Sequence, residues 1–247
     1  MTEWMLLAGG LIIAFAAFVG GVTGVGDSLV STGLLILIGT PLEIVVTVNL
    51  VVTVVTRIIV TTRLRAAIEW RIVTILAIGS LFGAVIGVWV TGITPPTVLQ
   101  AVIGAVLIVA SIGLALSKVV RHEHEPHLAT VAGVGMIAGA FGSMASLNGM
   151  PAALLMARTA LSSRRVLATL AAFLLISSCI ALVAVAVSGQ AQWQAVLEVG
   201  IFWIPGALLA NWLGTTLGPR LPAHIFRWIV IGLVAVAGAI TVAKAFS

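Results

Sequence analysis

The chain consists of long runs of apolar residues separated by short breaks rich in Gly, Pro and basic residues. Ten apolar segments can be distinguished, eight close to membrane-spanning length and two short. Because a bilayer span needs about 20 apolar residues, the long segments predict membrane helices, with Gly and Pro supplying most of the stops. We expect these helices at residues 4–24, 42–62, 71–91, 97–117, 128–145, 166–188, 195–217 and 222–246.

The two short segments predict half-length helices. One covers residues 28–38 and follows the break Gly24-Val25-Gly26-Asp27, and the other runs from the break at Ser146–Pro151 to Leu161. A segment of about eleven residues spans roughly 17 Å as a helix, which is about half of a ~30 Å hydrocarbon core. Their N-termini are therefore predicted at membrane depth, one approached from each side.

The composition excludes a water-soluble globule. Hydrophobic residues make up 61% of the 247-residue chain and charged residues only 8%, whereas soluble domains are about 25% charged. The net charge of +5 does not point to a nucleic-acid partner, because the basic residues lie in the loops, where they determine membrane topology. Together with the helix pattern, this predicts an all-α polytopic membrane protein whose surroundings are the lipid bilayer.

Threading the segments alternately through a bilayer sorts the basic residues. With the N-terminus outside, eleven of the twelve Lys and Arg residues fall on the cytoplasmic side and only Lys244 lies outside. Because cytoplasmic loops carry the excess of basic residues, this sorting predicts that both termini lie outside the cytoplasm.

The two halves of the chain resemble each other. Glu69-Trp70 before the fourth segment matches Gln192-Trp193 before the ninth at an offset of 123, and the same offset places Gly83-Ala84 on Gly206-Ala207. The two breaks before the short segments align at an offset of about 122. Chance similarity among Gly- and Ala-rich helices is the alternative, but the matched short segments favour a duplication.

Each half holds five segments, an odd number, so the second half enters the membrane from the opposite side. The pattern predicts two inverted repeats, an architecture found in transporters. We expect a first membrane repeat over residues 1–117, a cytoplasmic linker over 118–127 and a second repeat over 128–247.

A helix N-terminus buried at membrane depth is a candidate anion site. It presents unpaired N–H groups and about half a positive charge, and an anion is a natural partner for both. The alternative is that side-chain caps satisfy these groups and nothing binds. The candidate substrate-binding residues at the two breaks are Asp27, Ser28, Leu29, Asn148, Gly149 and Met150.

Polar residues within the long segments add three candidates. Asn49, Thr53 and Arg57 recur every four residues on one face of the predicted third segment. The planar guanidinium of Arg57 suits an oxyanion, and the alternative is that the Arg57 side chain snorkels to the cytoplasmic interface six residues away.

Other polar residues have a structural and a functional interpretation. Asp27 is either a helix cap or a proton-linked or gating carboxylate, and Asn148 could likewise act only as a cap. Asn211 and Ser80 are expected to make helix–helix hydrogen bonds.

These features resemble the TauE/SafE-type sulfite and organosulfonate exporters (TSUP), whose halves each carry a Gly-rich motif, a Trp-containing element, a Gly-Ala helix and a Pro-rich turn. Two departures, Asp27-Ser28 in place of further glycines and the weak second copy Ser146–Met150, bear on the substrate more than on the fold. The matching elements are Gly24–Ser28, Ala66–Trp70, Gly79–Gly87, Ile93–Pro96, Ser188–Trp193 and Leu217–Pro222.

The resemblance implies export of a small sulfur oxyanion, such as sulfite or a short organosulfonate, across a bacterial inner membrane. Alternating access between the repeats is the implied mechanism, with coupled protons as a further hypothesis. A carrier for another organic or carboxylate anion and a non-transporting membrane subunit are the alternatives, and the oligomeric state is left open. An intramembrane enzyme is disfavoured because Asp27 has no intramembrane His partner.

No cofactor is expected. The sequence has neither a GxxxxGKS phosphate loop nor an HExxH zinc motif. The His-rich stretch His122–His127 contains Pro126 and has no nearby Cys, so we interpret it as a solvated loop and expect no metal site.

Overall fold

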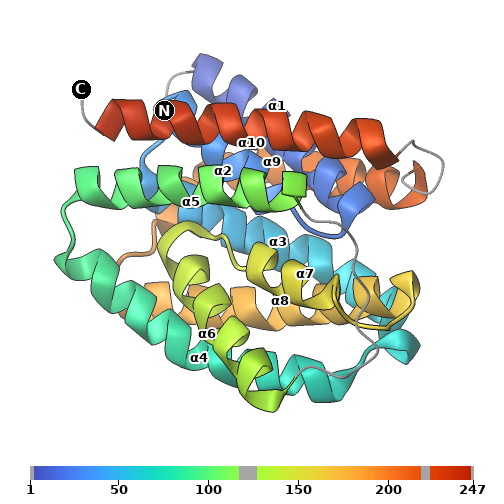
Figure 1. The fold of residues 1–247 in the computed structure, drawn as a ribbon. Coiled ribbons are helices and arrows are strands. Elements are labelled where there is room, and N and C mark those ends of the chain that lie inside the picture. Colours follow the sequence, from blue (N-terminus) through green and yellow to red (C-terminus); the bar gives the residue numbers. More distant parts are fainter. Residues whose placement is uncertain (1–2, 117–126, 218–222, 246–247) are drawn as a thin grey trace. The chain divides into compact units, whose positions relative to one another are not determined.

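A computed structural model describes residues 3–116, 127–217 and 223–245 of the chain (Figure 1). Over these residues the fold is all-helical, with ten α-helices and one 3₁₀ turn. The elements are α1 (Glu3–Thr23), α2 (Asp27–Leu37), α3 (Leu42–Leu64), η1 (Arg65–Ala67), α4 (Trp70–Ile93), α5 (Pro96–Leu116), α6 (Leu128–Ala145), α7 (Gly149–Met156), α8 (Ser163–Val187), α9 (Trp193–Leu217) and α10 (Ala223–Ala245).

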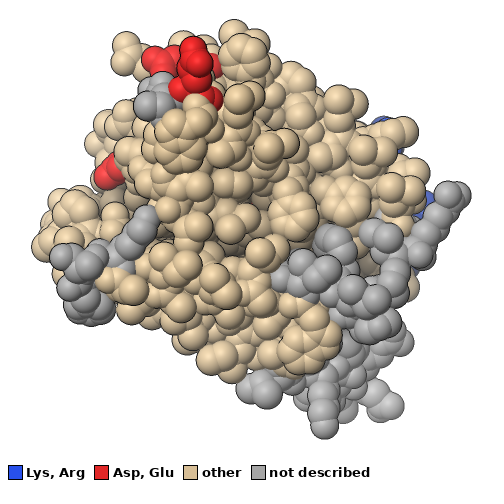
Figure 2. Space-filling model, turned by 90° about the horizontal axis from the view of Figure 1, so that it is seen from above, with Lys and Arg blue, Asp and Glu red and all other residues tan. Residues whose placement is uncertain are grey.

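The helices confirm a polytopic membrane protein. Among the described residues, seven helices are long and apolar enough to cross a bilayer. The eighth expected span corresponds to the 23-residue α10, whose residues 231–243 form a shorter apolar stretch. Side chains exposed on the helices are largely apolar, and the described surface on the face shown in Figure 2 is almost entirely free of charged residues.

The two short helices differ in length. α2 has the expected 11 residues, but α7 has only 8 and ends at Met156, so the expectation of a helix reaching Leu161 is wrong. The chain turns there because the backbone N–H groups of Arg158 and Thr159 donate to Leu155 and Met156, three residues back. Such tight bonds close a helix at its C-terminus.

The helices form two compact units. One unit comprises α1, α2, residues 42–49 of α3, α5, α9 and α10. The other comprises residues 50–64 of α3, then η1, α4 as far as Val90, α6, α7 and α8. Each unit thus combines helices from both halves of the sequence. The units are defined by contacts, whereas the division at residues 118–127 was proposed from the similarity of the two halves, so the two divisions describe different properties.

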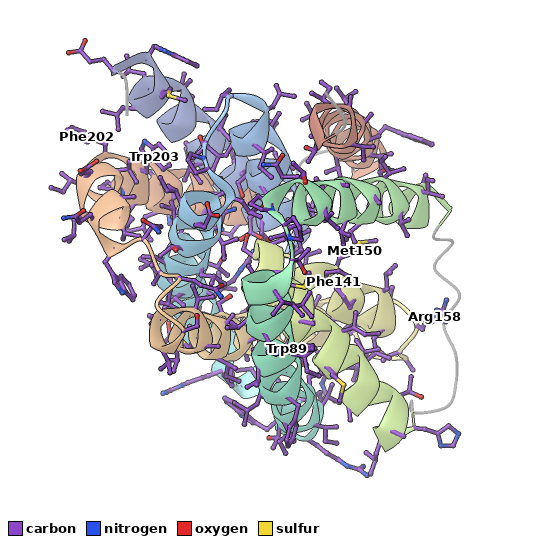
Figure 3. The ribbon with its side chains drawn as sticks, turned by 90° about the vertical axis from the view of Figure 1, so that its left-hand side faces the viewer. Trp89, Phe141, Met150, Arg158, Phe202 and Trp203 are labelled. Carbon is purple, nitrogen blue, oxygen red and sulfur yellow. The ribbon has the colours of Figure 1, made fainter. Side chains whose placement is uncertain are left out.

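In the first unit, α1 and α9 pack in parallel through glycines. The indole of Trp203 lies against Gly9, and a Cβ placed on Gly21 would lie 2.5 Å from the carbonyl oxygen of Asn211. Trp203 is 1% exposed, whereas its neighbour Phe202 points away from the helix pair (Figure 3). The Nε1–H of Trp203 donates to the carbonyl oxygen of Leu6 at 2.8 Å, which joins the two helices where the glycines leave room.

The same unit contains an antiparallel pair, α5 and α10. A Cβ on Gly104 would lie 2.9 Å from the carbonyl oxygen of Gly238, and the reverse contact has the same distance. On α2, Gly33 packs against Ala237 of α10 and the Leu107 side chain of α5. Small residues therefore allow close backbone approach here, as they do in other membrane helix bundles.

In the second unit, α4 and α6 pack in parallel along a glycine stripe. Gly79, Gly83 and Gly87 of α4 meet Ala132, Met136 and Ala140 of α6 in the same order along the chain. The relative directions within all three pairs agree with the predicted threading. In that threading α1 and α9 both run inward and α4 and α6 both run outward, whereas α5 and α10 run in opposite directions.

The packing supports the internal duplication. Three buried positions on α4 coincide with three buried positions on α9 at the offset of 123 found in the sequence. The pairs are Leu76 and Val199, Ser80 and Trp203, and Ala84 and Ala207.

Candidate functional site

The first break lies between α1 and α2 and depends on glycine. Gly24 and Gly26 have φ values of 78° and 101°, in the left-handed region that glycine adopts without steric cost. Gly26 occupies the N-cap position of α2, where it provides no side chain, and its carbonyl oxygen accepts the first helical bond from the N–H of Val30 at 3.0 Å.

Asp27 is the first residue within α2, so the interpretation of Asp27 as the N-cap is wrong, because the cap position belongs to Gly26. Its side chain is buried, with 8% exposure, and the adjacent Ser28 and Leu29 are buried as well. The hydroxyl of Ser31 donates to the carbonyl oxygen of Asp27 at 2.8 Å. The amide groups of a first helical turn have no acceptor within the helix, and the N-cap residue Gly26 offers them no side-chain acceptor.

The three polar candidates on α3 are buried. Asn49, Thr53 and Arg57 are 3%, 5% and 0% exposed, so the predicted face is correct. Asn49 lies in the first unit, where its Nδ2 donates to Thr32 Oγ1 of α2 at 3.0 Å. This amide group therefore joins α3 to the short helix α2.

Arg57 lies in the second unit and is among the largest fully buried side chains. Its complete burial argues against the alternative that the guanidinium reaches water at the cytoplasmic interface. A charged group at such a position in a membrane helix is costly and marks a functional site by default. Arg57 thus becomes a stronger anion-binding candidate than the sequence alone made it.

The second break, between α6 and α7, forms its turn with a serine in the left-handed position instead of a glycine. Ser146 has a left-handed φ of 58°, and its N–H donates to the carbonyl oxygen of Gly142 at 2.9 Å. The N–H of Leu147 donates to Phe141 at 3.0 Å. This pair of bonds closes the end of α6 in the way that glycine-terminated helices close, which explains how a poor copy of the Gly-rich motif still forms the break.

Asn148 occupies the N-cap position of α7 but does not cap it. Its backbone is helical, with φ −74° and ψ −19°, and it makes no side-chain cap bond. Instead its Nδ2 donates to Ser178 Oγ of α8 at 3.0 Å, and both residues are at most 1% exposed. The alternative that Asn148 acts only as a cap is therefore wrong.

The first turn of α7 begins with Gly149 and Met150 (Figure 3). Pro151 follows, and it has no N–H to leave unpaired. Gly149 is buried and Met150 is partly buried. As at α2, the N-cap residue makes no side-chain bond to the first amides of the short helix.

Two adjacent buried serines on α8, Ser177 and Ser178, were not predicted from the sequence. Ser178 holds Asn148, and the adjacent Ser177 pairs with Ser80 of α4 through an Oγ–Oγ distance of 2.7 Å. The expected helix–helix role of Ser80 is thereby confirmed, as is that of Asn211, which donates to Ala17 O at 3.2 Å. Two adjacent hydroxyl residues within an otherwise apolar segment were the signal, since neighbouring positions on a helix face different partners.

No metal-binding group of three His, Cys, Asp or Glu side chains occurs among the described residues. Of the His-rich stretch only His127 is described, as an exposed residue directly before α6. The prediction that this stretch is a solvated loop lies otherwise outside the described residues.

Comparison with known proteins identifies the family. The family model described as sulfite exporter TauE/SafE matches residues 9–241, nearly the whole chain. Neither the curated proteins nor the solved structures that were compared include a match. Because the matched range covers all ten helices at least in part, the chain belongs to the TauE/SafE sulfite exporter family, a family of membrane transporters of sulfur compounds.

Proposed function

We propose that the protein exports a small sulfur oxyanion, such as sulfite or a short organosulfonate, across the bacterial inner membrane. The family supports the class of transporter. The observation that carries the anion-binding part is that both short helices begin without a side-chain cap, at Gly26 for α2 and at Asn148 for α7. Uncapped N-termini buried in protein favour an anionic ligand.

The proposed binding residues are those named from the sequence. Ser28 and Leu29 supply backbone N–H groups in the first unit, and Gly149 and Met150 do so in the second. The buried Arg57 supplies the positive charge, because a guanidinium donates two parallel hydrogen bonds to an oxyanion. Asn49 in the first unit and Thr53 in the second are proposed as further polar contacts.

Asp27 is proposed to couple proton and anion movement. Ionised, it would repel an anion bound at the first turn of α2. At ~4 Å and an effective dielectric constant of ~20 this repulsion is about 4 kcal/mol, or about a thousandfold in affinity. Protonation removes the repulsion, so substrate should bind more tightly at low pH, and binding should favour proton uptake.

The transport mechanism is proposed to be alternating access of two inverted repeats, with both termini outside the cytoplasm. The parallel packing of α1 with α9 and of α4 with α6 supports the alternating helix directions of this proposal. Each compact unit contains helices from both halves of the sequence, so a movement of one unit would involve both proposed repeats.

The function is tested by flux from proteoliposomes loaded with labelled sulfite, with and without a pH gradient. We expect saturable efflux above that of protein-free vesicles, competition by short alkyl sulfonates, and weak competition by carboxylates of equal size. Strong competition by carboxylates alone would identify a carboxylate carrier instead. No flux of either class from a folded, correctly inserted protein would favour a non-transporting subunit.

A further inference from the structure

Two pairs of exposed tryptophans occupy equivalent positions on α4 and α9. Trp70 is the first residue of α4 and Trp89 lies near its end, while Trp193 begins α9 and Trp212 lies near its end. The offset of 123 that relates the two halves carries Trp70 onto Trp193 and Trp89 onto Trp212. The four side chains are 53%, 64%, 46% and 49% exposed, in that order along the chain.

The spacing within each pair matches the thickness of a bilayer. Both pairs are 19 positions apart, which is about 28 Å along a helix at ~1.5 Å per residue. The hydrocarbon core of a membrane is about 30 Å thick. Tryptophan favours the two boundaries of this core, where its ring is apolar and its N–H can bond to headgroups.

The residues between the two tryptophans of α4 form an exposed apolar band. It contains Ile78, Phe82 and Val85, each more than half exposed. On the inner side the band is bordered by the exposed Arg71, which suits the anionic headgroups of the cytoplasmic leaflet.

α9 carries a similar band, in which Leu197, Ile201 and Leu209 are each at least 66% exposed. Its one charged side chain, Glu198, is exposed in the second turn. It lies only five positions, about 7.5 Å, from Trp193 and thus remains within reach of the same interface.

We infer that these tryptophans are bilayer anchors, each pair fixing the depth of its helix against the headgroup regions of both leaflets. The partner of this surface is a lipid bilayer with a hydrocarbon core of about 28 Å. The duplication has thus preserved the membrane boundaries of the fourth helix of each repeat, in addition to its buried face. This inference does not depend on which substrate the protein transports.

The test uses tryptophan fluorescence in liposomes containing lipids brominated either near the headgroup or near the chain end. Each variant keeps Trp203 and one of the four anchors, and all other tryptophans are changed to Phe. Trp203 stays because it is 1% exposed and bonded to Leu6, and the variant with Trp203 alone gives the background. Circular dichroism confirms that each variant is folded.

We expect each anchor to lose more fluorescence with the shallow label than with the deep label, and Trp203 to respond to neither. Stronger quenching by the deep label at either member of a pair would overturn the inference. So would the absence of quenching by both lipids, because the tryptophan would then be covered by protein. In wild-type protein, thermal stability should be highest in lipids with a core of about 28 Å and lower in thinner and thicker bilayers.

Discussion

The hydroxyl group of Thr169 on α8 accepts a hydrogen bond of 3.1 Å from the backbone N–H of Glu69, the residue before α4. In the other unit, Thr47 on α3 accepts a bond of 3.2 Å from the N–H of Gln192, the residue before α9. The two donors are 123 positions apart and the two acceptors 122. Each bond therefore ties the fourth helix of one half of the sequence to the third helix of the other half.

Replacing either threonine with valine should destabilise the protein, because the amide before the helix loses its acceptor. Thr169→Val and Thr47→Val should each cost about 1 kcal/mol, or roughly 2–4 °C in the midpoint of thermal unfolding. Thr62→Val is the matched control, since Thr62 is exposed and bonds only within its own helix. Equal midpoints for all three variants would show that the two bonds do not stabilise the fold.

The glycine stripe of α4 should tolerate no side chain. A Cβ on Gly83 would collide with the backbone of Met136 and lie 2.9 Å from the N of Ala140. Gly83→Ala should therefore cost about 1–3 kcal/mol through overpacking, and less detergent-extracted protein should remain monodisperse after heating. Gly133→Ala on α6 is the control, because nothing lies within 4 Å of its Cβ. A loss of stability in the control equal to that of Gly83→Ala would contradict the close packing.

The effects of Asn148 and Ser178 on substrate binding should depend on each other. If Ser178 serves to hold the Asn148 side chain away from the first turn of α7, Ser178→Ala should weaken sulfite binding. Added to Asn148→Ala, however, it should have no further effect, because interacting residues are not additive. Ser177→Ala, which removes the bond to Ser80 instead, is the control for loss of a buried hydroxyl. Additive effects of Asn148→Ala and Ser178→Ala on the dissociation constant would refute this coupling.

Asp27→Asn mimics the neutral carboxyl group. It should bind a short sulfonate at high pH at least as tightly as the wild type does at low pH, and its binding should no longer depend on pH. A sulfonate is the right probe because its own charge does not change over this range. Glu43→Gln, at an exposed position in the first turn of α3, should keep the wild-type profile. If Asp27→Asn also keeps it, Asp27 does not couple protons to transport.

Much of the fold could be predicted because membrane helices are recognisable in a sequence as long apolar segments. The bounds of α6 were predicted to the residue, and those of α2 and α5 to within one. The end of α7 could not be predicted, because an apolar sequence continues past Met156 and the turn is made by backbone bonds at Leu155 and Met156. The sequence also could not predict that each compact unit combines helices from both halves of the chain, because the hydrophobic pattern describes one helix at a time.

The candidate site was predicted less completely. Burial of Asn49, Thr53 and Arg57 followed from their spacing on one helix face. The roles of Gly26 and Asn148 did not, because a cap depends on side-chain direction: Asn148 turns to Ser178, thirty residues away in sequence. Whether a side chain bonds to a local or a distant partner depends on how the helices pack, which the sequence of a single segment does not show.

Calorimetric titration of purified protein with sulfite tests whether the buried guanidinium of Arg57 binds a sulfur oxyanion. Arg57→Lys preserves the charge but loses the planar pair of donors, so we predict several-fold weaker binding in a variant that remains folded. Arg63→Lys, at an exposed position on the same helix, should bind as the wild type does. Unchanged sulfite affinity in both Arg57→Lys and Arg57→Gln would contradict the account.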